Sequence, residues 1–377
     1  QGDTMISLMC ISLSLALRVG APAEEPTVRV EDYMIDLRDR LPHSGRFRPG
    51  ETDFATWSRR TRAHLAKLLA LPDVEKRLLD AWEGEWERVT VRGTEHRRQR
   101  VLLRTEERLW VPAYLCLPPD AEGPLPVVIC CQGHAQDGMR VSLGLIDDDS
   151  WQSLVVEGDR DNALQAVRNG YAALALELRS FGELRDAEDL EANATSSCTR
   201  HTLLALQAGR VLMGMRVHDV MAAIDYLSGR PEIDASRIAM TGNSGGGTIT
   251  FYASAMDERI RAAIPSCAFC TFRDSIQGVN HCACNFIPEM SVSMEMDDLA
   301  GLIAPRWQLI IAGKDDAIFP IDGVREAYER LETIYRAAGV PERLQLYVGQ
   351  GGHRYYAEPV PEFLARAFAG PGTGGVR

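Results

Sequence analysis

Short unbroken apolar runs alternate with helical patterns between residues 127 and 368 of this chain. The runs at 127–131 and 171–176 have no polar interruption, which is typical of strands buried on both faces of a sheet. Further strands are expected at 238–240, 260–264, 307–312 and 344–348, and helices at 161–169, 200–227, after 247 up to 256, 324–338 and 361–368. This alternation predicts an α/β fold with a mostly parallel central sheet and helices on both faces.

The earlier part of the chain has a different pattern. Apolar positions between residues 53 and 71 recur at helical spacing until Pro72 ends the pattern. Residues 86–117 then read as antiparallel strands that open the sheet. We therefore expect a partly helical N-terminal extension over residues 1–84 and an α/β domain over residues 85–377.

The composition excludes several classes of protein. The 377 residues include 41 Lys and Arg against 53 Asp and Glu, a net charge of −12, and 45% of them are hydrophobic. This hydrophobic share is ordinary for a globular protein, and the acidic balance argues against a nucleic-acid partner, because binding phosphates requires a basic surface. No apolar stretch is long enough to span a membrane, so we expect neither nucleic acid nor membrane as a partner. The sequence does not predict the oligomeric state.

The first residues contain a signal-like segment. An apolar run followed by small residues lies within residues 5–23, as in the export signals of secreted proteins. Such signals carry a positive charge before the apolar run, whereas Asp3 is the only charge there. We favour a cytoplasmic protein, with export to the periplasm or medium as the alternative.

The segment 241–247 reads Thr-Gly-Asn-Ser-Gly-Gly-Gly and lies between an expected strand and an expected helix. It matches the pattern G-x-S-x-G with Gly242, Ser244 and Gly246. A turn this tight needs glycine on both flanks and holds the serine in strained backbone angles at the carboxyl edge of the sheet. Ser244 is therefore a candidate nucleophile, and the amide of Gly245 at the helix N-terminus would face a developing oxyanion.

This turn has two other interpretations, a phosphate-binding loop and a turn without chemistry. A phosphate-binding loop fits less well, because no Lys follows the glycines and the dinucleotide pattern G-x-G-x-x-G is absent. A glycine-rich turn without chemistry is the remaining alternative.

A serine nucleophile needs a base and an acid that orients it, and in this architecture the chain order is Ser, acid, His. Only His281 and His353 follow Ser244. His353 follows the last expected strand and is the candidate base, whereas His281 precedes every late acid and is expected to be a surface residue. Asp315 and Asp316 follow the strand at 307–312; only one of them can face the imidazole, and the spacing does not select between them.

Three segments, 237–246, 313–320 and 352–353, resemble the α/β-hydrolase superfamily, more narrowly its dienelactone-hydrolase and acetyl-xylan-esterase-like branch. The resemblance extends over roughly residues 85–370. It implies an α/β-hydrolase fold and a Ser-His-Asp triad.

The resemblance also assigns two further residues. The acid motif of that branch, G-x-x-D-x-x-x-P, falls on Gly313, Asp316 and Pro320, and so selects Asp316 as the acid. The second oxyanion donor of such enzymes follows a His-Gly pair after an early strand, which implies the amide of His134 here. This chain has Gln132 in place of that histidine, so the surrounding hydrogen bonds cannot be carried over.

The nine cysteines do not form a recognisable disulfide framework. A zinc site is an alternative for one group of residues, namely Cys267, Cys270, His281, Cys282 and Cys284. Its spacing is irregular, so buried free thiols are the preferred reading, with a disulfide as the alternative if the protein is exported. We expect no cofactor and no metal, and the Met-rich residues 269–302 are a candidate lid or an ordinary packed insertion.

These residues predict a serine esterase in which Ser244 attacks a small-molecule carboxylic ester, His353 transfers the proton and Asp316 orients the imidazole. The resemblance implies short acyl groups, such as acetyl on a carbohydrate. A peptidase or a C–C bond hydrolase could use the same triad, and a non-catalytic binding protein on this scaffold is the third alternative.

Overall fold

The computed structural model describes residues 29–74 and 76–369, and the signal-like residues 5–23 lie outside them. Residues 29–40, which contain helix α1 (Val30–Asp39), form a unit separate from the rest of the chain. No helix of the described residues has the length and apolar character needed to cross a membrane.

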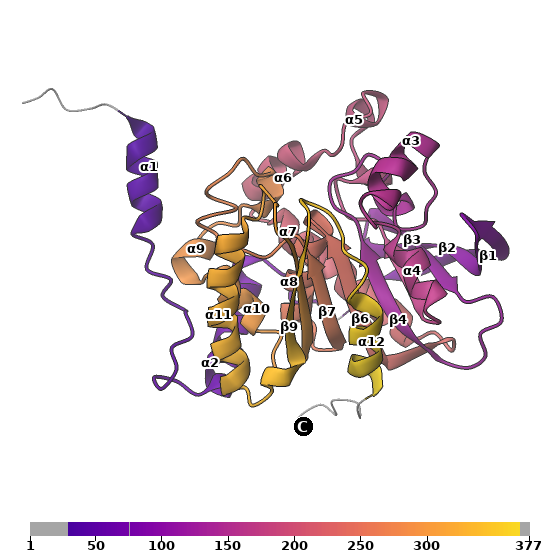
Figure 1. Ribbon diagram of the computed structural model, residues 1–377. Coiled ribbons are helices and arrows are strands. Elements are labelled where there is room, and N and C mark those ends of the chain that lie inside the picture. Colours follow the sequence, from indigo (N-terminus) through magenta and orange to yellow (C-terminus); the bar gives the residue numbers. More distant parts are fainter. Residues whose placement is uncertain (1–28, 75, 370–377) are drawn as a thin grey trace, which may run out of the picture. The chain divides into compact units, whose positions relative to one another are not determined.

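The central sheet contains nine strands among the described residues (Figure 1), in the spatial order β1-β2-β3-β5-β4-β6-β7-β8-β9. Their bounds are β1 Asp80–Val91, β2 Thr94–Glu106, β3 Leu109–Leu117, β4 Leu125–Cys131, β5 Ala172–Leu176, β6 Ile233–Asn243, β7 Ile260–Ser266, β8 Trp307–Gly313 and β9 Leu344–Gly349. The first three strands and β5 pair antiparallel, and the pairs from β5 through β4, β6, β7 and β8 to β9 are parallel. The predicted antiparallel opening and the parallel remainder of the sheet are both confirmed.

The helices of the unit that begins at Leu41 are α2 Phe54–Leu68, α3 Asp148–Trp151, α4 Asn162–Arg168, α5 Ala187–Glu191, α6 Cys198–Gln207, α7 Leu212–Ser228, α8 Gly245–Met256, α9 Met290–Ser293, α10 Met296–Gly301, α11 Ile321–Ala337 and α12 Val360–Ala369. Short helical turns lie at η1 Gly138–Arg140, η2 Gln152–Val156, η3 Gly182–Leu184, η4 Ala283–Asn285 and η5 Pro341–Arg343. The helical stretch expected at 200–227, with Gly209 and Gly214 as candidate interruptions, is two helices. The chain turns between them at Gly209, which has a positive φ of 68°.

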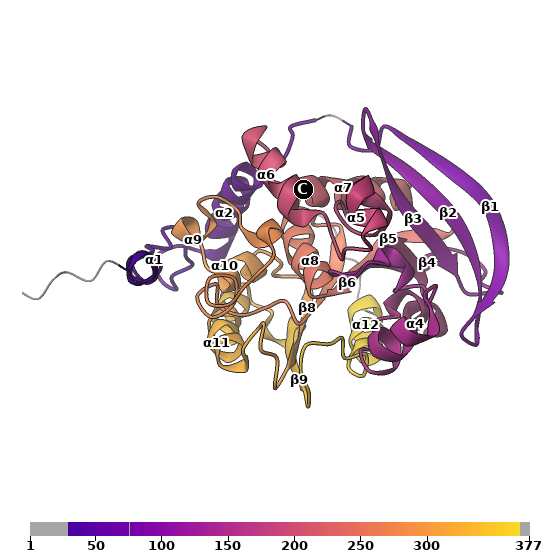
Figure 2. The ribbon, with the colours of Figure 1, turned by 90° about the horizontal axis from the view of Figure 1, so that it is seen from above.

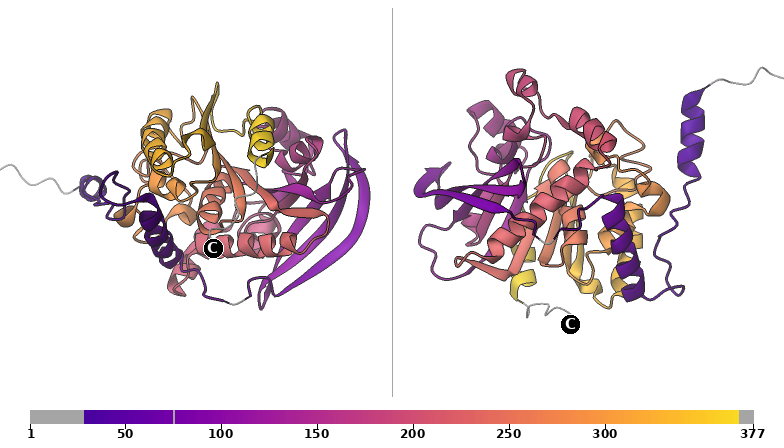
Figure 3. Two further views of the ribbon diagram at one scale, coloured as in Figure 1. Left: turned by 90° about the horizontal axis from the view of Figure 1, so that it is seen from below. Right: turned by 180° about the vertical axis from the view of Figure 1, so that it is seen from behind.

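Helices cover both faces of the sheet, as the apolar strands require. Alternate residues of β4 enter two different cores: Ile129 belongs to the core that also contains α7 and α8, and Val128 to the core that contains α4 and α12. Figure 2 shows α7 and α8 on one side of the strands and α4 and α12 on the other. Trp57 and Leu65 of α2 belong to the first of these cores, so part of the predicted extension packs with the α/β domain (Figure 3).

Candidate active site

The turn between β6 and α8 holds Ser244 at φ 56° and ψ −120°, a backbone conformation that non-glycine residues rarely adopt. The amide of Ser244 donates to the carbonyl oxygen of Ser266 on the neighbouring strand β7, at 2.9 Å. The side chain is half-buried at the carboxyl end of the central strand. Backbone strain fixed in this way by a neighbouring strand is typical of a nucleophile at a strand-to-helix turn.

The two glycines of the motif are required by close packing. A Cβ on Gly242 would lie 2.5 Å from the carbonyl oxygen of Cys131 on β4, and a Cβ on Gly246 would lie still closer to the same atom. Any side chain at either position would therefore displace the serine turn or the adjacent strand.

His353 and Asp316 meet in the loops after β9 and β8. Nδ1 of His353 lies 2.9 Å from Oδ2 of Asp316. The other carboxylate oxygen, Oδ1, accepts hydrogen bonds from the amides of Ile318 at 2.8 Å and Phe319 at 3.1 Å. Both oxygens of the Asp316 carboxylate are thus hydrogen-bonded, and the carboxylate orients the ring of His353.

The two adjacent aspartates have different surroundings. Asp316 is buried and Asp315 is exposed, so the structure places Asp316, the residue selected by the resemblance, against the imidazole. Burial acts to raise the pKa of Asp316. The hydrogen bond and charge of His353 and the two amide bonds outweigh burial and lower the pKa below its usual value. Asp316 is therefore an anion at neutral pH.

Ser244 and His353 line one cavity of about 410 Å³. Its other walls are both polar and apolar and come from several loops and from the start of α8: His134, Arg160, Thr195, Gly245, Thr248, Asn280, His281, Cys282, Asn285, Ile318 and Phe319. His281, expected at the surface, lies in this wall instead, with its ring edge against Phe319 at 5.3 Å and Nε2 2.9 Å from the hydroxyl of Ser275. Burial lowers the pKa of His281.

The loop after β4 lies beside the N-terminus of α8. A Cβ on Gly133 would approach the backbone nitrogen of Gly245 to 3.0 Å, so only glycine lets the peptide before His134 lie this close. Gln132, which replaces the histidine of the family motif, is buried, and its Nε2 donates to the hydroxyl of Ser142 at 2.8 Å and the carbonyl of Arg160 at 2.6 Å. The glutamine therefore anchors the loop that carries the predicted amide of His134.

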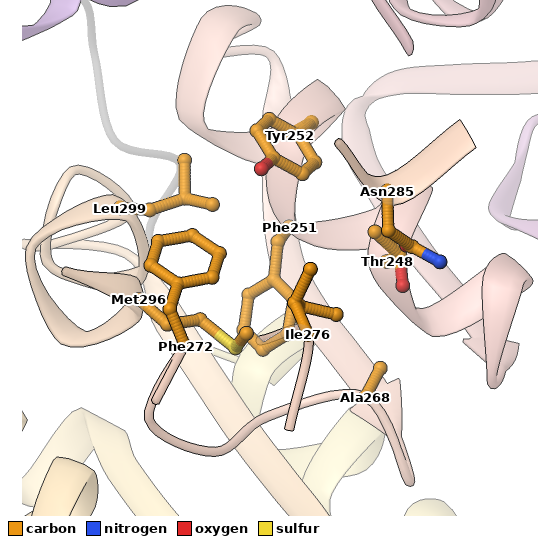
Figure 4. A pocket seen from close by; sticks show the side chains of 9 residues that line it. All are labelled: Thr248, Phe251, Tyr252, Ala268, Phe272, Ile276, Asn285, Met296 and Leu299. Carbon is orange, nitrogen blue, oxygen red and sulfur yellow. The ribbon is translucent and has the colours of Figure 1, made fainter. Parts of the chain in front are cut away.

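A second, very small cavity of about 10 Å³ adjoins this wall, with Thr248 and Asn285 lining both. Figure 4 shows these two residues together on one side and the apolar side chains opposite them: Phe251, Tyr252, Phe272, Ile276, Met296 and Leu299. Several of these side chains come from residues 269–302, which pack tightly onto α8. This volume equals about one water molecule.

The residues considered for zinc are divided between different sites. Cys267 donates to the carbonyl of Arg354, Cys270 lies against the carbonyl of Pro320, and His281 bonds to Ser275. Cys282 and Cys284 instead converge with His134 and Cys198. Sequence reasoning did not single out Cys198, because it lies 64 residues from His134 and shares no motif spacing with it.

Comparison with known proteins agrees with this architecture. The family model described as acetyl xylan esterase (AXE1) matches residues 154–283, which include Ser244 but neither Asp316 nor His353. The curated protein “Putative hydrolase YtaP” of Bacillus subtilis (strain 168) is 27% identical over 245 residues, 64% of this chain and 77% of its own length. The chain is thus similar to esterases and to a hydrolase, and its fold is that of an α/β-hydrolase.

Solved structures show the same fold. The protein described as a “putative acetyl xylan esterase” from Bacteroides fragilis NCTC 9343 superposes with a TM-score of 0.69 and 15% identity, over 90% of this chain and 86% of that one. A glucuronoyl esterase from Solibacter usitatus gives a TM-score of 0.63 and 14% identity, over 88% of this chain and 99% of its own. The predicted fold is thereby confirmed.

Proposed function

We propose that this α/β-hydrolase is a serine esterase that cleaves short-acyl esters of polar, hydroxyl-rich alcohols, with acetylated carbohydrates as the leading class. The observation that carries the proposal is the strained Ser244 in a polar cavity that it shares with His353, whose Nδ1 is bound to the buried Asp316.

The chemistry follows from these contacts. Because Nδ1–H of His353 donates to Asp316, its Nε2 carries a lone pair and can remove the proton of the Ser244 hydroxyl as Oγ attacks the ester carbonyl. The amides of Gly245 and His134 stabilise the oxyanion, and His353 returns the proton to the leaving alcohol. Water, activated by the same imidazole, then releases the acid from Ser244. No step needs a metal or a cofactor.

The substrate class rests on the walls of the cavity. Asn280, Asn285 and Thr195 offer donors and acceptors to the hydroxyl groups of an alcohol. The adjoining apolar cavity holds about one water molecule's volume, which accommodates a methyl group and no long chain. The names of two matches support the same class: acetyl xylan is the substrate named for the family model and for the protein from Bacteroides fragilis.

A fluorophosphonate probe and a substrate panel test the proposal together. We expect the probe to label the wild type and not Ser244→Ala, and kcat/KM for p-nitrophenyl acetate to fall by about 10⁴-fold or more in that variant. Acetylated xylo-oligosaccharides should be cleaved faster than butyryl or longer-chain esters. Labelled enzyme that cleaves only peptides or β-diketones would overturn the ester assignment, and unlabelled protein would overturn the nucleophile.

A further inference from the structure

Three cysteines and a histidine from distant parts of the chain converge beside the active-site cavity. They are His134 in the loop after β4, Cys198 at the first position of α6, Cys282 just before η4, and Cys284 within η4. Their ligand atoms all lie within 4.8 Å of one another. Cys198 and Cys284 are buried, whereas Cys282 is partly exposed toward the cavity.

We propose that these four residues form a closed Cys₃His site for a zinc ion. The inference goes beyond the proposed esterase chemistry and does not depend on it.

Three of the six ligand–ligand distances lie near the edges of a zinc tetrahedron. A zinc ion with Zn–S of about 2.3 Å and Zn–N of about 2.0 Å places its sulfurs about 3.8 Å apart and each sulfur about 3.5 Å from the nitrogen. Nε2 of His134 lies 3.6 Å from Sγ of Cys198 and 3.8 Å from Sγ of Cys284, and the sulfurs of Cys282 and Cys284 are 3.4 Å apart. Three soft sulfur ligands and one imidazole are also the donor set that zinc prefers.

The charge of the surroundings is a second, independent observation. Arg216 on α7 is 1% exposed and donates from Nη2 to Sγ of Cys198 at 3.2 Å. Its Nε and Nη2 also donate to the carbonyl oxygen of Arg179, and its guanidinium lies over the ring of Phe181 at 4.4 Å. Within the described residues no carboxylate pairs with this buried cation. A buried arginine requires a counter-charge, and the sulfur of Cys198 is the group that faces this one.

Zinc binding would supply the counter-charge that Arg216 needs. The three thiols bind as thiolates and release their protons to solvent, while His134 binds as the neutral imidazole. Zinc with three thiolates carries one net negative charge, which the guanidinium of Arg216 neutralises. With four protein ligands no open position remains, so the site is structural.

The site would join three walls of the cavity. His134 and Cys282 themselves line the cavity, and Cys198 and Cys284 tie α6 to residues 269–302. Metal binding would therefore fix the loop whose amide at His134 is the proposed oxyanion donor, and would hold the candidate lid segment to α6.

Metal analysis of the full chain, purified without a polyhistidine tag or chelator, tests the site. We expect about one zinc per chain in the wild type and in the matched control Cys116→Ala, which removes a buried thiol of β3 outside the cluster. Cys198→Ser and Cys284→Ser should lose the metal. Because either variant could fail to fold, the chelated wild type is also titrated with Co²⁺ under reducing conditions, where tetrahedral thiolate coordination gives intense visible bands at one equivalent.

Each alternative outcome is decisive. Wild-type protein that binds neither zinc nor cobalt stoichiometrically would overturn the proposal, as would metal retained in both serine variants. A disulfide among Cys198, Cys282 and Cys284, found by peptide mapping without reduction, would also overturn it. Esterase activity is not the readout, so failure of the metal site and failure of the proposed function remain distinguishable.

Discussion

His353 and His134 both line the cavity that contains Ser244, but their ring nitrogens bond to different groups. Nδ1 of His353 bonds to a buried carboxylate, which leaves Nε2 available for proton transfer. Nε2 of His134 instead lies against two sulfurs. The same side chain, at the same edge of the sheet, can act as a base in one loop and as a metal ligand in the other, because its partner determines which nitrogen is available.

The carboxyl groups near the two loops differ in the same way. Asp316 receives two amide bonds and the histidine, and its pKa is lowered. Glu177 lies beneath the loop that carries His134, accepts weak amide bonds from Met139, Leu178 and Glu183 at 3.3–3.4 Å, and is held between Gly138 and Gly182. Burial outweighs these bonds and raises the pKa of Glu177 to about 7.

The largest expected effect separates the histidines around Ser244. His353→Ala should lower kcat/KM by about 10⁴-fold, because no other base with a bound carboxylate lines the described cavity. His281→Ala is the matched control: it removes a ring that packs against the same Phe319, and it should change kcat/KM by less than about 10-fold. Steady-state kinetics on p-nitrophenyl acetate measure both. Equal losses of kcat/KM in the two variants would show that His353 is not the base that distinguishes this site.

Exchange of the acid should have the next largest effect. Asp316→Asn removes the charge that orients His353, and we expect kcat/KM to fall by about 10³-fold with little change in KM. Asp315→Asn, one residue earlier and exposed, should leave kcat/KM unchanged. If the Asp315 variant were the defective one, the assignment of the acid would be wrong.

Removal of the buried cation tests the other loop. Arg216→Met removes the buried cation beside Cys198, and the thiolates of the proposed zinc site would lose their counter-charge. We expect the free energy of unfolding to fall by about 4 kcal/mol. Arg200→Met, on the exposed side of α6, should change it by less than about 1 kcal/mol. Urea denaturation followed by circular dichroism measures the difference. Unchanged stability in Arg216→Met would show that no buried anion faces this guanidinium.

The smallest effect is a pH dependence of stability. The folded-state pKa of Glu177 is above its unfolded value of about 4.3, so the folded protein binds more protons between these two pH values, and stability decreases as pH rises through this window. Between pH 5 and pH 8 this contribution changes by at most about 3 kcal/mol. Glu177→Gln should therefore reduce the decrease in Tm between pH 5 and pH 8.

Two comparisons control this measurement. Glu295, whose pKa burial also raises to about 7, keeps its own contribution, so the pH dependence should shrink and not vanish. Glu191→Gln on exposed α5 should leave it unchanged. Asp316 contributes with the opposite sign: its lowered pKa gives stability that is present above about pH 4 and is lost as pH falls further.

The sequence by itself determined the features that depend on residues close to one another along the chain. Apolar runs between helical patterns predicted the parallel part of the sheet, and G-x-S-x-G between a strand and a helix predicted the turn at Ser244. These patterns are readable because strand burial and tight turns are set by local chain geometry. The resemblance, and not the spacing, selected Asp316, and the structure places that residue against His353.

Only the tertiary structure decided which distant loops meet. Three features depend on segments that lie between 18 and 150 residues apart. They are the convergence of His134, Cys198 and Cys284, the position of Arg216 beside them, and the place of His281 in the cavity wall. No spacing in the chain encodes such contacts, because they arise from the order in which strands enter the sheet and from the loops that this order brings to one edge. The expectation of a chain without metal stays a prediction, and the convergence of these four residues is the basis of the metal site that we propose.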